Sequence, residues 1–279
     1  MSWQATFQAL LHRAGYQLVP TVKFLELRRA ANRSLDYSIS GGDLSAYEHW
    51  FTSVFNNSVP RPGALIATSW SPEVEWGRRA HSALVGIEVD YVEHLLREIR
   101  ADSVEGVIME FGIFEGWWVD KLCEFSEDLG LHRDVYGFDS FEGLPAPSPE
   151  SDDPFWRAGQ YLASYEEVSR RLRVDRRPSI HLVKGWFRDT LRLPETLAIK
   201  RVAYARIDSD IYESAVDCLN YLADRLSDKA ILVFDDWPHR LDIGEGKAFA
   251  EWLPGVPQLT FEFLFYNTWG HLYLRAHRR

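Results

Sequence analysis

The fold of this chain is decided by the stretch Val107-Ile108-Met109-Glu110-Phe111-Gly112-Ile113-Phe114-Glu115-Gly116. Its opening part, Val107–Phe111, is a short apolar run that is typical of a buried strand. Gly112 and Gly116 then allow a tight turn, in which the backbone approaches a ligand closely before a helix begins. Their spacing differs from the G-x-G-x-x-G of enzymes that bind a dinucleotide. The stretch therefore predicts a strand, a ligand-binding turn and a helix.

Similar apolar runs recur further along the chain, separated by segments with helical periodicity. Strands are expected at Val135–Phe138, Ile180–Val183, Val202–Ile207, Ile231–Phe234, Leu259–Phe265 and His271–Leu274. The helices expected between them include Ser164–Leu172 and Tyr212–Leu226. This alternation predicts an α/β fold with a doubly wound, mostly parallel sheet, and the last two runs predict a C-terminal antiparallel hairpin.

The first hundred residues have a different character. They are rich in tryptophan and tyrosine and contain helical periodicity at Phe24–Arg29 and again at Val92–Ile99. We expect residues 1–100 to form a helical cap or lid and residues 101–279 to form the ligand-binding domain.

Composition excludes several classes of function. The net charge of −10 opposes binding to nucleic acid, which needs clustered lysine and arginine. No apolar run approaches the ~20 residues that a membrane-spanning helix needs, and no signal peptide is recognisable. Cys123 and Cys218 are expected to be reduced core thiols. A soluble cytoplasmic protein is therefore the expectation.

The residues after the first three strands suit a nucleoside with an amino-acid moiety. Glu110 and Glu115 offer a carboxylate to an ammonium group beside the glycine turn. Asp139, with Ser140 beside it, ends the next strand about 20 residues further on, where a carboxylate can bind both ribose hydroxyls. The alternative for Asp139 is a helix N-cap. At Gly185-Trp186, after the third strand, an adenine ring is expected against apolar surface.

Carboxylates also follow the fourth and fifth strands. Asp208 comes directly after one, and Asp235 and Asp236 come directly after the other. Such a cluster repels itself unless a cation is bound, and Mg²⁺ prefers oxygen ligands. The sequence therefore predicts a Mg²⁺ site formed by these residues. The alternative is that arginines such as Arg206 and Arg240 pair with the acids.

Together these motifs resemble those of the macrocin-type sugar O-methyltransferases. The matching stretches are Glu110-x-Gly112 with Gly116, Asp139-Ser140-Phe141-Glu142-Gly143-Leu144-Pro145, Ile207-Asp208-x-Asp210-x-Tyr212-Glu213-Ser214, Asp235-Asp236 and Gly246-Lys247-Ala248. The resemblance extends from about Ser82 to Leu253. It implies the class I methyltransferase fold, S-adenosylmethionine (SAM) as methyl donor with S-adenosylhomocysteine (SAH) as product, and Mg²⁺. It also implies a glycosylated or hydroxylated small-molecule acceptor and a homodimer.

The resemblance implies two residue roles. Asp208, Asp235 and Asp236 would bind the metal, and Asp139 would bind the ribose. Methyl transfer also needs a general base that removes the proton of the acceptor hydroxyl, and for this role we expect Asp208 first and His239 second.

Two other functions stay open at this point. If the tryptophans line the site, the acceptor would instead be a phenol or catechol whose vicinal hydroxyls bind the metal. Alternatively, the chain is a non-catalytic SAM-binding module, although the intact acid cluster argues against this.

Overall fold

The computed structural model describes residues 38–40, 75–237, 241–266 and 270–279. By its internal contacts the chain divides into two compact units, residues 1–37 with 45–94 and residues 38–44 with 95–279. Helix α5 (Glu75–Ala101) begins in the first unit and ends in the second, and it contains the helix predicted at Val92–Ile99. The helix predicted at Phe24–Arg29 lies outside the described residues. The domain boundary near residue 100 stays a prediction.

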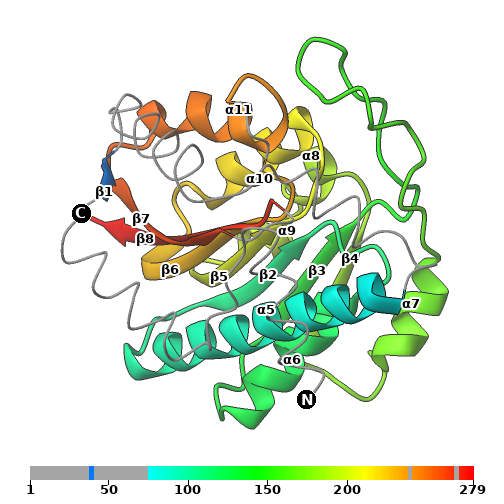
Figure 1. Ribbon diagram of the computed structural model, residues 1–279. Coiled ribbons are helices and arrows are strands. Elements are labelled where there is room, and N and C mark those ends of the chain that lie inside the picture. Colours follow the sequence, from blue (N-terminus) through cyan, green and yellow to red (C-terminus); the bar gives the residue numbers. More distant parts are fainter. Residues whose placement is uncertain (1–37, 41–74, 238–240, 267–269) are drawn as a thin grey trace. The chain divides into compact units, whose positions relative to one another are not determined.

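The second unit is built on a sheet with the strand order β1-β7-β8-β6-β5-β2-β3-β4 (Figure 1). Its strands are β1 (Ser38–Ser40), β2 (Val107–Phe111), β3 (Val135–Asp139), β4 (Ile180–Lys184), β5 (Val202–Ile207), β6 (Leu226–Phe234), β7 (Leu259–Tyr266) and β8 (Leu272–Arg278). The strands from β6 to β4 run parallel, whereas β8, β7 and β1 join antiparallel. The predicted fold class, with its C-terminal hairpin, is confirmed.

Helices cover both faces of this sheet. They are α6 (Trp117–Asp128), α7 (Tyr165–Leu172), α8 (Phe187–Thr190), α9 (Pro194–Leu197), α10 (Tyr212–Leu222), α11 (Gly244–Trp252) and the short 3₁₀ helix η1 (Leu253–Gly255). Figure 1 shows α6 on one face and α10 and α11 side by side on the other. Every residue of β5 is consequently buried, as expected for a central parallel strand covered on both sides.

Two predictions about these elements were wrong. The helix expected to reach Leu226 ends at Leu222, because Leu226 already pairs with Val202 in the sheet. Within the first hundred residues, expected to be helical or irregular, Ser38–Ser40 is an edge strand that pairs with β7.

The register of the parallel strands aligns the predicted site residues. Phe111 of β2 pairs with Phe138 of β3 and with Ile207 of β5, which in turn pairs with Phe234 of β6. The residues that directly follow these paired positions in the four strands therefore lie side by side at the carboxyl edge of the sheet. They are Gly112, Asp139, Asp208 and Asp235.

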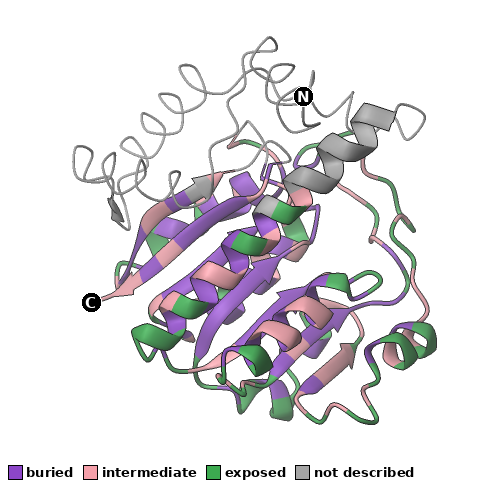
Figure 2. Ribbon diagram, turned by 60° about the horizontal axis from the view of Figure 1, so that its bottom comes forward, coloured by how far each residue is buried: buried purple, intermediate pink, exposed green. Residues whose placement is uncertain are grey.

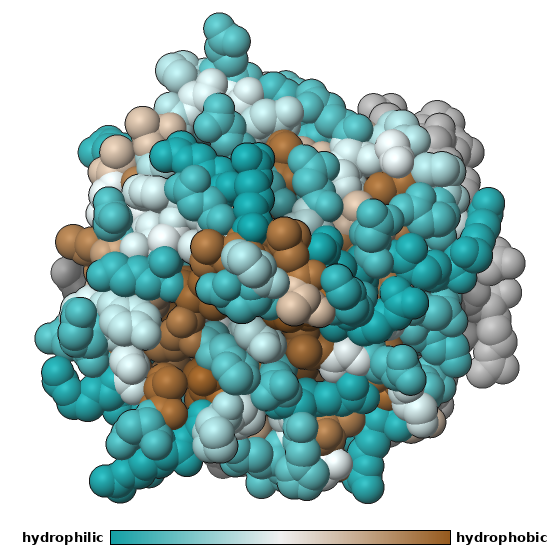
Figure 3. Space-filling model, turned by 180° about the vertical axis from the view of Figure 1, so that it is seen from behind, coloured by the Kyte–Doolittle hydropathy of each residue, from teal (hydrophilic) through white to brown (hydrophobic). Residues whose placement is uncertain are grey.

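The core lies along the strands. Figure 2 shows buried residues along the sheet and a mixture of burial classes on the helices, so the helices present polar faces to solvent. In Figure 3 hydrophilic residues make up most of the visible surface, and apolar side chains gather between them. Among the described residues no helix is both long and apolar enough to cross a membrane.

Candidate active site

Gly112 lies where the chain passes closest to the neighbouring strand. Its φ of +85° is in the left-handed region that favours glycine. A Cβ at this position would lie 1.7 Å from the backbone oxygen of Asp208, so no side chain fits. Gly116, with φ of +76°, is the N-cap of α6. The predicted glycine turn is therefore present, and it lies directly against the backbone that carries Asp208.

The Asp139 carboxylate holds this turn in place. Oδ2 accepts hydrogen bonds from the amides of Ile113 (3.0 Å) and Phe114 (2.9 Å), and Oδ1 accepts one from Phe141 (2.7 Å). Burial raises the pKa of Asp139, although these amides oppose the shift. A carboxylate offers about four acceptor sites, so three amides leave one for a ligand hydroxyl. Asp139 thus supports the turn and retains an acceptor site for one ribose hydroxyl, rather than for the two that were predicted.

The other residues predicted to bind the cofactor have different surroundings. The Ser140 hydroxyl donates to the carbonyl of Gly143 at 3.0 Å and accepts from the amide of Glu142, which stabilises the loop after β3. Glu115 is exposed and forms an ion pair with Arg171 at 2.9 Å. Gly185 and Trp186 follow β4 at the same edge of the sheet.

The amide of Gly185 donates to the carbonyl of Asp139 at 2.8 Å, which joins the loop after β4 to the loop after β3. Trp186 is the half-buried N-cap of the short helix α8. The backbone of this pair therefore lies beside Asp139, where the adenosine part of a cofactor is predicted.

Glu110 is almost completely buried beneath the glycine turn. Burial raises the pKa of its carboxyl to about 8, although the nearby guanidinium of Arg206 lowers it. Its Oε2 atom is buried and has no hydrogen-bond partner among the described residues. A buried acceptor without a partner fits a site that receives a hydrogen-bond donor or a cation from a ligand.

Asp235 faces a different partner from the other acids. Its Oδ1 accepts from the guanidinium of Arg206, a fully buried side chain that also lies 4.4 Å from the ring centroid of Trp118. Its Oδ2 lies 3.4 Å from Nε2 of His271. For Asp235 the structure therefore shows the ion pair that the sequence left open as the alternative to metal binding.

Three carboxylates nevertheless meet at the edge. Oxygen atoms of Asp208, Asp210 and Asp236 all lie within 4.8 Å of one another. Burial raises the pKa of each, and the neighbouring carboxylates raise it further. Asp210 also has φ of +62°, an unfavourable conformation that is often found at functional sites. The acid cluster, as we call these three residues, thus differs from the predicted metal ligands in one member, with Asp210 in place of Asp235.

Glu245 is a buried part of the site that sequence reasoning missed. Its completely buried Oε1 accepts from the amide and the hydroxyl of Ser209 (3.1 and 3.3 Å), and its Oε2 accepts from the amide of Asp236 (3.2 Å). It therefore joins the two loops that carry the acid cluster. The signal for Asp210 was its place two residues after Asp208, whereas nothing in the sequence marked Glu245.

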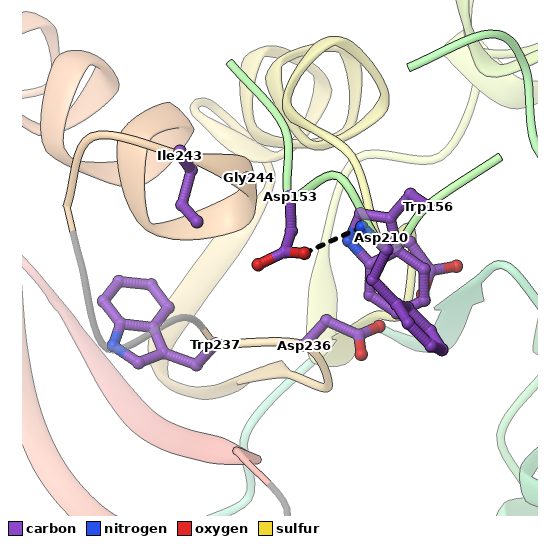
Figure 4. A pocket seen from close by; sticks show the side chains of 8 residues that line it. Asp153, Trp156, Asp210, Asp236, Trp237, Ile243 and Gly244 are labelled. Carbon is purple, nitrogen blue, oxygen red and sulfur yellow. Dashed lines mark hydrogen bonds between the residues drawn. The ribbon is translucent and has the colours of Figure 1, made fainter. Parts of the chain in front are cut away.

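A cavity of about 250 Å³ opens beside the acid cluster (Figure 4). It is lined by Asp153, Phe155, Trp156, Asp210, Asp236, Trp237, Ile243 and Gly244. In Figure 4 the Asp236 side chain points toward Asp210 and Trp156, and Trp237 lies at the opposite side. Such a mixture of aromatic walls and a few polar groups is typical of small-molecule sites. His239 and Arg240, which follow Trp237, lie outside the described residues.

Known proteins share both the sequence and the fold. One relative, from Streptomyces olivaceus, is 28% identical over 176 residues. It is described as 8-demethyl-8-(2,3-dimethoxy-alpha-L-rhamnosyl)-tetracenomycin-C 4'-O-methyltransferase. These residues cover 58% of this chain and 65% of the relative. The demethyldecarbamoylnovobiocin O-methyltransferase of Streptomyces niveus is 28% identical over 179 residues, covering 58% and 64%. The matches thus span less than two thirds of either relative.

Solved structures agree on the fold. The O-methyltransferase NovP has a TM-score of 0.57 at 24% identity, over 68% of this chain and 80% of its own. The calicheamicin methyltransferase CalS11 has a TM-score of 0.53 at 22% identity, over 85% and 95%. The fold is that of the class I SAM methyltransferases.

Residues 64–245 match the family described as macrocin-O-methyltransferase (TylF). Because this match covers more than half of the sequence and includes the glycine turn and the acid cluster, the chain belongs to the macrocin O-methyltransferase family.

Proposed function

We propose that this protein transfers a methyl group from SAM to a hydroxyl of a sugar on a natural product or a nucleotide sugar, with the help of Mg²⁺. The observation that carries the proposal is the acid cluster beside the glycine turn, at the edge where ligands bind in doubly wound folds. Family membership supports the same reaction. A phenolic acceptor and a non-catalytic role are the alternatives.

The residues around the glycine turn fit the methyl donor. SAM supplies an electrophilic methyl group when it is bound. Gly112 lets the turn pack directly against the backbone of Asp208, and Gly116 lets α6 begin beside Leu172, so the two glycines set the shape of the turn. Glu110 offers its unpartnered oxygen toward a cationic group, and Asp139 retains one acceptor site for a ribose hydroxyl.

Asp139→Asn is expected to weaken SAH binding by about 10- to 100-fold, equivalent to roughly 1.5–3 kcal/mol for a charge-assisted hydrogen bond. The amide side chain would also present a donor to the turn amides, which now donate to Oδ2. Titration calorimetry with SAH measures the effect. Asp134→Asn is the matched control, since Asp134 is exposed at the opposite end of the same strand. Equal SAH affinity in the two variants would remove Asp139 from the ribose role.

The acid cluster fits a divalent cation. Its ligand atoms are all carboxylate oxygens, which Mg²⁺ prefers, and a cation would offset the mutual repulsion that raises their pKa values. When bound, Mg²⁺ would lower the pKa of the acceptor hydroxyl. Asp208 would accept the proton of that hydroxyl, and Glu245 holds the two loops of the cluster together. His239 is the second candidate for the base.

We further propose that the protein is a cytoplasmic homodimer, with residues 1–100 as a cap that contributes to the interface. Family membership and the aromatic-rich first hundred residues support this assembly. Light scattering is expected to give about twice the chain mass of 32.3 kDa. A mass of one chain at every protein concentration tested would contradict the dimer.

A further inference from the structure

A long loop between β3 and α7 carries aromatic side chains that are not packed in the core. Phe155 is 62% exposed and Tyr161 is 41% exposed, although both are large and apolar. Trp156 lies between them in the sequence and is half-buried. Exposed aromatic groups in a cluster indicate a binding surface rather than a core.

The part of this loop that precedes the aromatic residues is hydrogen-bonded to the helices that begin near the acid cluster. Oδ1 of Asp152 accepts from the amide of Tyr212, the first residue of α10, at 2.7 Å. The hydroxyl of Ser151 accepts from the ammonium of Lys247 on α11 at 2.7 Å, and its carbonyl accepts from the amide of Gly244. The aromatic residues that follow are therefore held at a defined position relative to the cluster.

The rings contact one another in a row from the cavity to the glycine turn. The centroids of Phe155 and Trp156 are 4.9 Å apart, those of Trp156 and Tyr161 are 6.2 Å apart, and those of Tyr161 and Phe114 are 5.7 Å apart. Burial raises the pKa of Tyr161, and so do the carboxylates of Asp210 and Asp236. The row thus lies next to the acid cluster and extends to the turn that would hold the methyl donor.

We propose that Phe155, Trp156 and Tyr161 form an aromatic wall against which the sugar ring of the acceptor packs. The proposal rests on the proposed function and adds the residues that determine the acceptor. A pyranose has an apolar face of C–H groups, which suits an aromatic ring, and hydroxyls around its rim, which suit carboxylate acceptors. The cavity provides both, because Asp153 and Asp236 line it together with Phe155 and Trp156.

The arrangement of the rings favours a sugar over a flat phenol. Neighbouring rings in the wall are inclined at 75° and 58° to one another, and the ring of Phe114 is inclined at 78° to that of Tyr161. They therefore do not form two parallel surfaces between which a planar ring would stack. A puckered ring with hydroxyls in several directions fits this surface better.

The test uses methyl α-L-rhamnopyranoside as the probe, in saturation-transfer NMR with the full chain, SAH and Mg²⁺. We expect transfer to the ring C–H protons of the sugar in the unchanged protein. Trp156→Ala should weaken sugar binding by about two- to twelvefold, because a well-placed aromatic contact contributes affinity beyond its buried area. Trp156→Phe should restore most of the binding.

Leu197→Ala is the matched control. Leu197 is an exposed apolar residue, 42% accessible, on α9, which precedes β5 and so lies at the amino edge of the sheet, opposite the site. Calorimetry with SAH on the same samples separates the two claims. Absence of SAH binding in the unchanged protein would contradict the proposed function.

Normal SAH binding with no transfer to the sugar, or with equal sugar affinity in Trp156→Ala, would overturn the aromatic wall. Displacement of the sugar by a tenfold lower concentration of catechol would overturn the assignment of a sugar and favour a phenolic acceptor. Sugar binding that is lost in Trp156→Ala and kept in Leu197→Ala would support the proposal.

Discussion

Asp208→Asn is expected to lower the rate of methyl transfer from SAM to a rhamnoside acceptor by roughly 10²–10⁴-fold. The change keeps the size of the side chain and removes its charge. Asp208 belongs both to the metal ligands predicted from the sequence and to the acid cluster, so its loss weakens metal binding under either assignment. It also removes the proposed base. Transfer of a labelled methyl group measures the rate.

The control for this variant is Asp224→Asn, which removes an exposed carboxylate after α10. It should leave the rate unchanged. If Asp208→Asn retained more than half of the rate of the unchanged protein, the carboxylate would be neither the base nor an essential metal ligand, and the acids would be reassigned to structural hydrogen bonds.

Gly112→Ala is expected to abolish SAH binding at concentrations that saturate the unchanged protein. Two effects add at this position. The left-handed φ of +85° strains an alanine, and its Cβ would lie 1.7 Å from the backbone oxygen of Asp208. The backbone of β2 or β5 must therefore shift, and the glycine turn and the acid cluster would both be displaced.

The Gly130→Ala variant tests whether backbone strain alone, without displacement of neighbouring backbone, would abolish SAH binding. Gly130 has a similar φ of +65°, but nothing lies within 4 Å of an added Cβ. This variant should lose about 1 kcal/mol of stability from strain and bind SAH normally. Calorimetry with SAH and thermal unfolding of both variants provide the measurement. Normal SAH binding by Gly112→Ala would show that the turn does not hold the cofactor.

The central strands were predictable to the residue because burial on both faces gives continuous apolar runs. Val107–Phe111 and Val202–Ile207 are strands with the expected limits. Ser38–Ser40 has no such run, and it becomes a strand only because it pairs with Thr260–Glu262 of β7. The end of α10 was similarly set by the pairing of Leu226, which is a contact distant in sequence.

The site was predictable in position but not in detail. Strand ends bring Asp208 and Asp235 to one edge, and this follows from a parallel sheet. The direction of each side chain depends on its buried neighbours. Arg206 forms an ion pair with Asp235, so this carboxylate has a cationic partner within the protein. Asp210 enters the cluster through a left-handed backbone conformation that the sequence does not indicate.

A titration with Mn²⁺, followed by electron paramagnetic resonance, tests whether the acid cluster binds a divalent cation. Manganese accepts the same oxygen ligands as Mg²⁺ and requires no knowledge of the acceptor. The acid cluster predicts one bound Mn²⁺ per chain, displaced by excess Mg²⁺, lost in Asp208→Asn and retained in Asp224→Asn. SAH should bind equally well with and without EDTA. No bound Mn²⁺, or equal binding in Asp208→Asn, would contradict a metal site at the acid cluster.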